Sequence, residues 1–78
     1  MKIKSILIER NHNPDKLYKV GETKTLTGAV STRDYLICRI VDGGNKYTVY
    51  AKSESGYEMP FFIIYKSKDR KIEVEYFK

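Results

Sequence analysis

Two residue types with catalytic potential occur only once each in this chain. His12 is the single histidine and Cys38 is the single cysteine. A general base needs a defined pocket and a partner that orients it, and the polar segment around His12, Pro14 and Asp15 offers neither. One histidine and one cysteine also cannot supply the four ligands of a tetrahedral zinc site. We therefore expect no catalytic residue, no metal and no cofactor.

Other groupings that resemble chemical sites have simpler explanations. The segment from Asp42 to Asn45 lacks the spaced oxygen ligands of a calcium loop and fits a hairpin turn. Glu73 and Glu75 lie two residues apart on an exposed strand beside Lys66 and Lys71, where charge pairs across the expected hairpin explain them. Cys38 is expected to face the core, because a free cysteine behaves there as a small hydrophobic residue.

Binding chemistry has better candidates. Aromatic rings alternate with cations on two expected neighbouring strands, with Tyr35 near Lys52 and with Tyr50 near Arg39 and Lys46. Proteins that bind single-stranded nucleic acids stack bases on aromatic rings and follow the phosphates with cations. The formal net charge of +5 also favours anionic partners, although moderately. The nucleic-acid hypothesis uses six residues: Arg33, Tyr35, Arg39, Lys46, Tyr50 and Lys52.

These side chains require a β framework to position them. The 78 residues leave room for one domain. From residue 33 onward, apolar and polar residues alternate between turn residues, which predicts strands. We expect one all-β domain over residues 1–78, with strands near 2–9, 22–27, 33–41, 46–52, 57–66 and 71–77. The order of strand, long loop, short strand and meander is similar to small barrels of SH3-like type, and an OB-like barrel or a small sandwich fits it too.

Three expected turns predict the register of the last four strands. A two-residue turn centred on Gly43-Gly44 pairs Ile40 with Tyr47. A three-residue loop ending at Gly56 pairs Ala51 with Met59, and a loop over residues 67–70 joins the last two strands into a hairpin. All three turns predict the same core face: Leu36, Cys38, Ile40, Tyr47, Val49, Ala51, Met59, Phe61, Ile63, Tyr65, Ile72, Val74 and Tyr76. Proline cannot donate to a ladder, so irregular pairing is expected at Pro60.

The opposite face of this sheet holds four apolar side chains inside a charged rim: Ile37, Tyr50, Phe62 and Ile64. An apolar patch of this kind needs a cover or a partner. Either the N-terminal strand covers it with Ile6 and Ile8, or it binds a protein partner or a second copy of the chain. The protein-binding hypothesis uses eight residues: Tyr35, Ile37, Arg39, Lys46, Tyr50, Lys52, Phe62 and Ile64.

The composition also bears on the class of protein. No apolar run approaches the roughly 20 residues of a membrane helix, and no signal sequence is evident, so a cytoplasmic protein with no membrane partner is expected. The leading hypothesis is a small, non-enzymatic protein-binding module, an inhibitor or adaptor of accessory or phage-like type, with homodimerisation compatible. The alternative is a β-barrel that binds single-stranded or non-specific nucleic acid. Two further segments could make contacts: the expected loop at 10–19 and the basic tip at 66–71.

Overall fold

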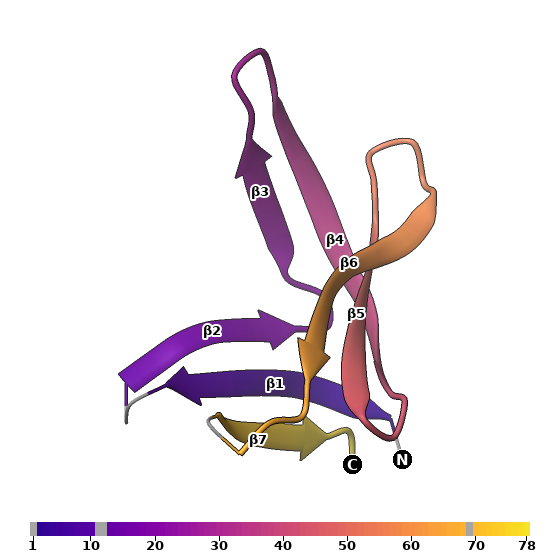
Figure 1. Cartoon of the computed structure of the whole chain (residues 1–78). Coiled ribbons are helices and arrows are strands. Elements are labelled where there is room, and N and C mark those ends of the chain that lie inside the picture. Colours follow the sequence, from indigo (N-terminus) through magenta and orange to yellow (C-terminus); the bar gives the residue numbers. More distant parts are fainter. Residues whose placement is uncertain (1, 11–12, 69) are drawn as a thin grey trace.

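Strands and turns make up the part of the chain that the structure describes. The computed structural model describes residues 2–10, 13–68 and 70–78. Its strands are β1 (Ile3–Arg10), β2 (Asn13–Lys19), β3 (Thr23–Thr27), β4 (Thr32–Asp42), β5 (Lys46–Lys52), β6 (Glu58–Tyr65) and β7 (Lys71–Tyr76). They form two antiparallel sheets, so the prediction of an all-β protein is confirmed (Figure 1). Within these ranges, no helix is long and apolar enough to cross a membrane.

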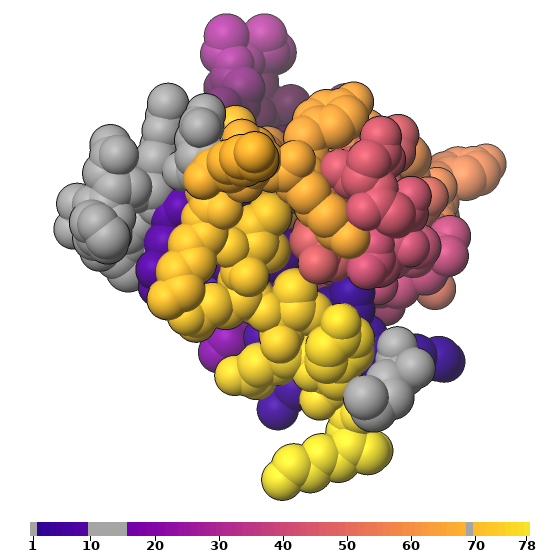
Figure 2. Space-filling view, turned by 60° about the horizontal axis from the view of Figure 1, so that its bottom comes forward, coloured from indigo at the N-terminus to yellow at the C-terminus, as the bar shows by residue number. Residues whose placement is uncertain are grey.

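The smaller sheet has β1 at its centre, between β2 and β7. The expected hairpin of β6 with β7 is wrong, because β7 pairs with β1 instead. The pairing sets Ile72 opposite Ile8 and Val74 opposite Ile6, which continues the apolar face of β1. The chain thus leaves the larger sheet after β6 and brings its C-terminal strand against its N-terminal one. Figure 2 shows the C-terminal segment in yellow lying against indigo β1.

The expected long loop at residues 10–19 is wrong over most of its length, since residues 13–19 form β2. His12 lies outside the described residues. Tyr18 on β2 is only 7% exposed, because its ring stacks on Phe62 with a centroid distance of 5.3 Å. Burial of this tyrosine supplies the packing that stabilises the strand. The polar composition of residues 11–16 predicts a loop instead, because it gives no sign of this packing.

The larger sheet is a meander with the order β3-β4-β5-β6. Its central hairpin turns one residue later than expected, because Gly43 donates its backbone N–H to the carbonyl of Lys46 and leaves Gly44-Asn45 as the two-residue loop. Gly44 has a φ of 94°, a conformation that glycine adopts without strain. The turn therefore sets Ile40 opposite Val49 rather than Tyr47. The shift moves the pairing by two residues, so the side chains of β5 keep the faces expected for them.

A β-bulge at Cys38 interrupts β4. Ile37 pairs with Ala51 and Arg39 pairs with Tyr50, so Cys38 is an extra residue on its strand. The bulge brings Ile37 and Ile40, three residues apart, to the same face, and both are buried. Regular alternation would place them on opposite faces. The predicted positions of Leu36 and Cys38 in the core are therefore wrong.

A second bulge lies on β6, next to Pro60. Val49 pairs with Phe62 and Tyr50 with Pro60, which leaves Phe61 as the extra residue. The irregular pairing expected at Pro60 is confirmed, as is the pairing of Ala51 with Met59 beyond it. The loop that ends at Gly56, with its positive φ of 87°, is also as expected. Beyond the bulge, to the end of β6, however, the side chains expected to face the core face outward, and those expected to face outward are buried or partly buried.

The core lies between the two sheets, and Figure 1 shows the smaller sheet lying crosswise under the lower half of the larger one. The smaller sheet contributes Ile3, Ile6, Ile8 and Tyr18, and the larger sheet contributes Ile37, Ile40, Val49, Ala51 and Ile64. Two of the apolar residues expected on the outer face, Ile37 and Ile64, are thus covered by a cluster that includes Ile6 and Ile8. The alternative in which the N-terminal strand covers the patch is confirmed for these two residues but not for Tyr50, which lies on the other side of the sheet. Two residues predicted to lie in the core, Ile63 and Tyr65, face outward instead.

Candidate functional site

The eight residues of the protein-binding hypothesis do not share one surface. The prediction that Ile37 and Ile64 face outward is wrong, because both are 0% exposed. Phe62 and Tyr35 are partly buried and pack against the core cluster. The other four residues, Arg39, Lys46, Tyr50 and Lys52, belong to the opposite side of the larger sheet.

The six residues of the nucleic-acid hypothesis are divided in the same way. Tyr35 faces inward and lies 5.5 Å from the ring of Phe61. Arg33, two residues earlier on β4, is on the same side of that strand. Tyr50 lies on the other face, in the row that pairs it with Arg39. One nucleic-acid strand following a single face of the sheet therefore meets only one of the two tyrosines.

The pairing of β4, β5 and β6 defines the side of the larger sheet that faces away from the core, and we call this side the outer face. Its residues alternate along the strands with the residues of two buried cross-strand pairs, Ile37–Ala51 and Ile40–Val49. Four apolar side chains on it are exposed: Leu36, Val41, Ile63 and Tyr65. The residues of the outer face are Leu36, Arg39, Val41, Lys46, Thr48, Tyr50, Lys52, Glu58, Pro60, Ile63 and Tyr65.

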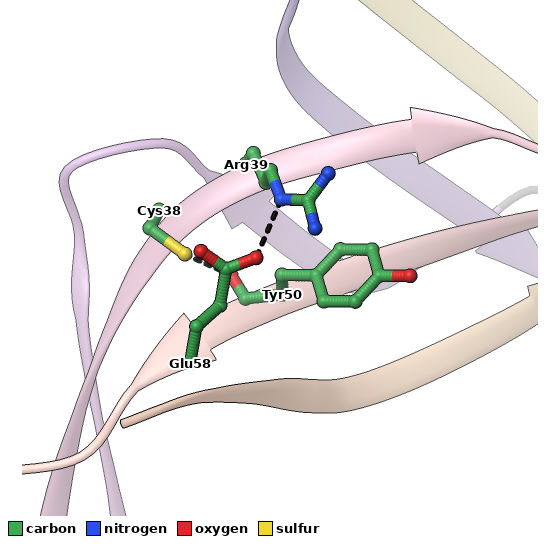
Figure 3. A network of polar contacts seen from close by, with 4 residues as sticks. All are labelled: Cys38, Arg39, Tyr50 and Glu58. Carbon is green, nitrogen blue, oxygen red and sulfur yellow. Dashed lines mark hydrogen bonds and ion pairs between the residues drawn. The ribbon is translucent and has the colours of Figure 1, made fainter. Parts of the chain in front are cut away.

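A compact polar network crosses the middle of the outer face (Figure 3). Arg39 on β4 donates from Nε to Oε1 of Glu58 on β6, over 2.6 Å, and its guanidinium carbon lies 4.1 Å from the ring centre of Tyr50 on β5. A planar guanidinium is suited to this combination of ion pair and ring stacking. Arg39 is therefore already engaged by an anion and a ring, and Glu58 offsets one of the positive charges on this face.

Cys38 lies beside this network rather than in the core. Its Sγ donates to the backbone carbonyl of Tyr50 over 3.3 Å, as Figure 3 shows. Desolvation raises the pKa of the Cys38 thiol, and the nearby negative charge of Glu58 raises it further. A cysteine becomes reactive as a thiolate, so this environment keeps Cys38 in its less reactive form. Nothing in the geometry favours nucleophilic chemistry at this position.

The basic tip at residues 66–71 is partly neutralised by ion pairs. Lys66 donates from Nζ to Oδ1 of Asp42 over 2.9 Å and lies 4.6 Å from the ring centre of Tyr47. The hydrogen bond from Lys66, helped by the backbone N–H of Gly44, lowers the pKa of the Asp42 carboxyl. Lys71 pairs with Glu73 at 3.4 Å within β7 itself, so the charge pairing expected across a hairpin of β6 and β7 is wrong.

An aromatic cluster that was not predicted from the sequence lies where β2 packs against β6. The ring of Tyr18 stacks on Phe62 and contacts Phe61 edge-on at 6.3 Å, while Lys16 lies 4.2 Å above the ring of Phe62. The adjacent residues Phe61 and Phe62 are the sequence feature that could have predicted this cluster. Two neighbouring aromatic residues on a strand can both pack inward only at a bulge. The cluster joins the two sheets and is a structural feature.

Comparison with protein-family models, with curated proteins and with solved structures finds no match to this chain. In the described ranges, no three metal-ligating side chains of the His, Cys, Asp or Glu type come together. The candidate site is therefore the outer face itself, defined by its exposed apolar residues and its partly neutralised charges.

Proposed function

We propose that this protein is a small, non-enzymatic protein-binding module and that its binding surface is the outer face. The observation that carries the proposal is the group of exposed apolar side chains, among them Ile63 at 40% and Tyr65 at 57% exposure. No other described segment covers them. Exposed apolar patches bordered by polar residues mark interaction surfaces in soluble proteins. A module of this kind acts by occupying a surface of a larger protein, as an inhibitor or an adaptor does.

The charges of the outer face support a protein partner over a nucleic acid. Glu58 pairs with Arg39, which removes one of the three cations from phosphate binding. The ring of Tyr50 is already stacked against the Arg39 guanidinium, which occupies a face that a base would need. Aromatic and arginine side chains beside aliphatic ones are typical of protein interfaces. Lys46 and Lys52 then serve as rim residues, where charges tune association rate more than affinity.

The architecture that we propose for the module is a small barrel of SH3-like or OB-like type. In support, β1 and β7 come from opposite ends of the chain and are neighbours in one sheet, while β4, β5 and β6 form a meander in the other. The chain turns from one sheet to the other at Gly21, whose N–H bonds the carbonyl of Ile37. The binding surface would then be the outside of the barrel wall.

Replacement of Ile63 and Tyr65 together by serine should abolish capture of the partner. The loss expected is about thirtyfold or more, because a single hot-spot side chain contributes about 2 kcal/mol. The measurement is quantitative mass spectrometry of proteins that co-purify with the tagged chain from cells that express it. Both side chains are exposed, so the variant should keep its thermal unfolding midpoint within a few degrees of the parent.

Tyr57→Ser is the matched control, because Tyr57 is 73% exposed but lies in the turn before β6 rather than on the outer face. This variant should capture the partner as the parent does. Equal capture by all three proteins would rule out the outer face. The nucleic-acid alternative has its own readout: binding of a fluorescent mixed-sequence single strand that weakens steeply between about 50 and 200 mM salt.

A further inference from the structure

The second half of β4 has a neighbour on only one side. Pairing with β3 ends at Leu36, and Ile37 then exchanges backbone hydrogen bonds with Glu22 and Gly21. From Cys38 to Asp42, β5 pairs with one edge of the strand, and no other strand of the described ranges pairs with the opposite edge. We call this free side the open edge of β4.

The hydrogen bonds of the hairpin identify the backbone groups at the open edge. Gly43 bonds Lys46 across the hairpin, so its polar groups point to β5. In an antiparallel strand the direction alternates along the chain, and the groups of Val41 therefore also point to β5. The N–H and C=O groups of Ile40 and Asp42 point the other way, to the open edge. They form two evenly spaced hydrogen-bonding positions on either side of Val41.

Beyond the bulge at Cys38, the open edge from Arg39 to Asp42 lacks the usual protection against strand pairing. Proteins blunt such edges with proline, exposed lysine or a bulge within the strand. Here the edge presents Val41, which is 37% exposed, while Ile40 is buried and Asp42 is neutralised by Lys66. A groove of about 640 Å³ runs along this part of the molecule, and its lining includes Ile3, Val20, Tyr76 and Phe77. An additional strand at this edge would cover apolar side chains of the groove.

We propose that the open edge of β4 pairs with the same edge of a second copy of this chain, around a two-fold axis at Val41. The edge is self-complementary in antiparallel register. Ile40 of each copy lies opposite Asp42 of the other, and each of these two pairs exchanges two N–H to C=O hydrogen bonds. The Val41 side chains meet across the axis on the outer face. Isologous contacts of this kind are the commonest in homodimers.

Two features of the chain fit this occupant better than an unrelated strand. No like charges lie opposite each other, since Asp42 of one copy meets Ile40 of the other. The turn that follows β4 begins with Gly43 and Gly44, so no side chain from these two residues obstructs the Val20–Gly21 corner of the second copy. The pairing would join the four-stranded sheets of the two copies into one continuous sheet and extend the outer face across the axis. This inference goes beyond the proposed function and does not rest on it.

Sedimentation equilibrium of three proteins tests the pairing. The parent chain should be a dimer. Val41→Lys should raise the dimer dissociation constant by roughly tenfold or more, because it sets two lysines against each other at the axis. Leu36→Lys is the matched control: it makes the same charge change on the same face and strand, at 44% exposure, where β3 already occupies the edge. It should remain dimeric.

Amide hydrogen exchange of the parent chain provides a second test that needs no variant. The amides of Ile40 and Asp42 should gain protection as protein concentration rises, whereas the amide of Val41 is bonded to β5 and should be protected at all concentrations. A parent that stays monomeric at millimolar concentration would overturn the proposal, as would equal dissociation of both lysine variants. Loss of the dimer with unchanged partner capture separates this inference from the proposed function.

Discussion

Ile64→Ala should lower the free energy of unfolding by about 2–5 kcal/mol, while Ile63→Ala, one residue earlier on β6, should lower it by less than about 1 kcal/mol. Ile64 is fully buried between the sheets, and its truncation removes apolar contacts and leaves a cavity. Ile63 points to solvent on the outer face. The difference follows from the bulge at Phe61, which exchanges the two faces of β6.

Urea unfolding followed by circular dichroism measures both free energies. A domain of this size has a small margin of stability, so Ile64→Ala alone could leave the chain unfolded in buffer. Ile64→Val keeps the measurement usable, with an expected loss of about 0.5–1.5 kcal/mol. If alternation were regular through β6, the order would be reversed and Ile63→Ala would be the costly substitution. That result would contradict the register described above.

Tyr18→Ala should destabilise the protein by about 3 kcal/mol or more, an effect comparable with truncation of a buried phenylalanine. Its ring stacks on Phe62 and meets Phe61 edge-on, so its loss removes the aromatic contacts that join β2 to β6. Thermal and urea unfolding of the purified variant measure the loss. If residues 10–19 were instead a recognition loop, the substitution would weaken binding and leave stability nearly unchanged.

Leu17→Ala is the matched control for this second prediction. Leu17 is the neighbour of Tyr18 on β2 but faces the other side of the smaller sheet, where it is exposed. Its truncation should cost less than about 1 kcal/mol. Equal losses for the two variants would contradict the assignment of Tyr18 to the core and with it the packing of β2 against the larger sheet.

All the strands except β2 could be predicted from the sequence, but the faces of β4 and β6 could not, because alternation fails at their bulges. The isoleucines at positions 37 and 40 are three residues apart in one strand and face the same side across the bulge at Cys38. Ile3 and Ile6 repeat this spacing in β1, where Lys4 is the extra residue. A pair of large aliphatic residues at this spacing in a strand is thus a signal of a bulge that regular alternation misses.

Long-range pairing was the other source of error. A turn around residue 68 fits a local hairpin, and local sequence carries no information that β7 would prefer β1 at the far end of the chain. The preference arises from apolar area, since Ile72 and Val74 complete the face formed by Ile6 and Ile8. Such a choice depends on the burial of two segments together and cannot be read from either one.

The candidate site was predicted in part. Arg39, Lys46, Tyr50 and Lys52 on β4 and β5 belong to the outer face as expected, because the later turn shifts their pairing by two residues and so leaves each on its face. Their apolar neighbours changed: Ile37 and Ile64 entered the core, and Leu36, Ile63 and Tyr65, which were expected in the core, lie outside. An exposed apolar surface remains after this exchange, composed of different residues.

Site-specific photo-crosslinking tests the central proposal, that the outer face binds a protein partner, most directly. Benzoylphenylalanine would replace Tyr65 on the outer face or, in a separate protein, Tyr57 in the turn before β6. After irradiation of cells that express each protein, position 65 should give one discrete adduct with another protein, and position 57 should give none. Identical adducts from both positions, or an adduct with nucleic acid at position 65, would contradict the proposal.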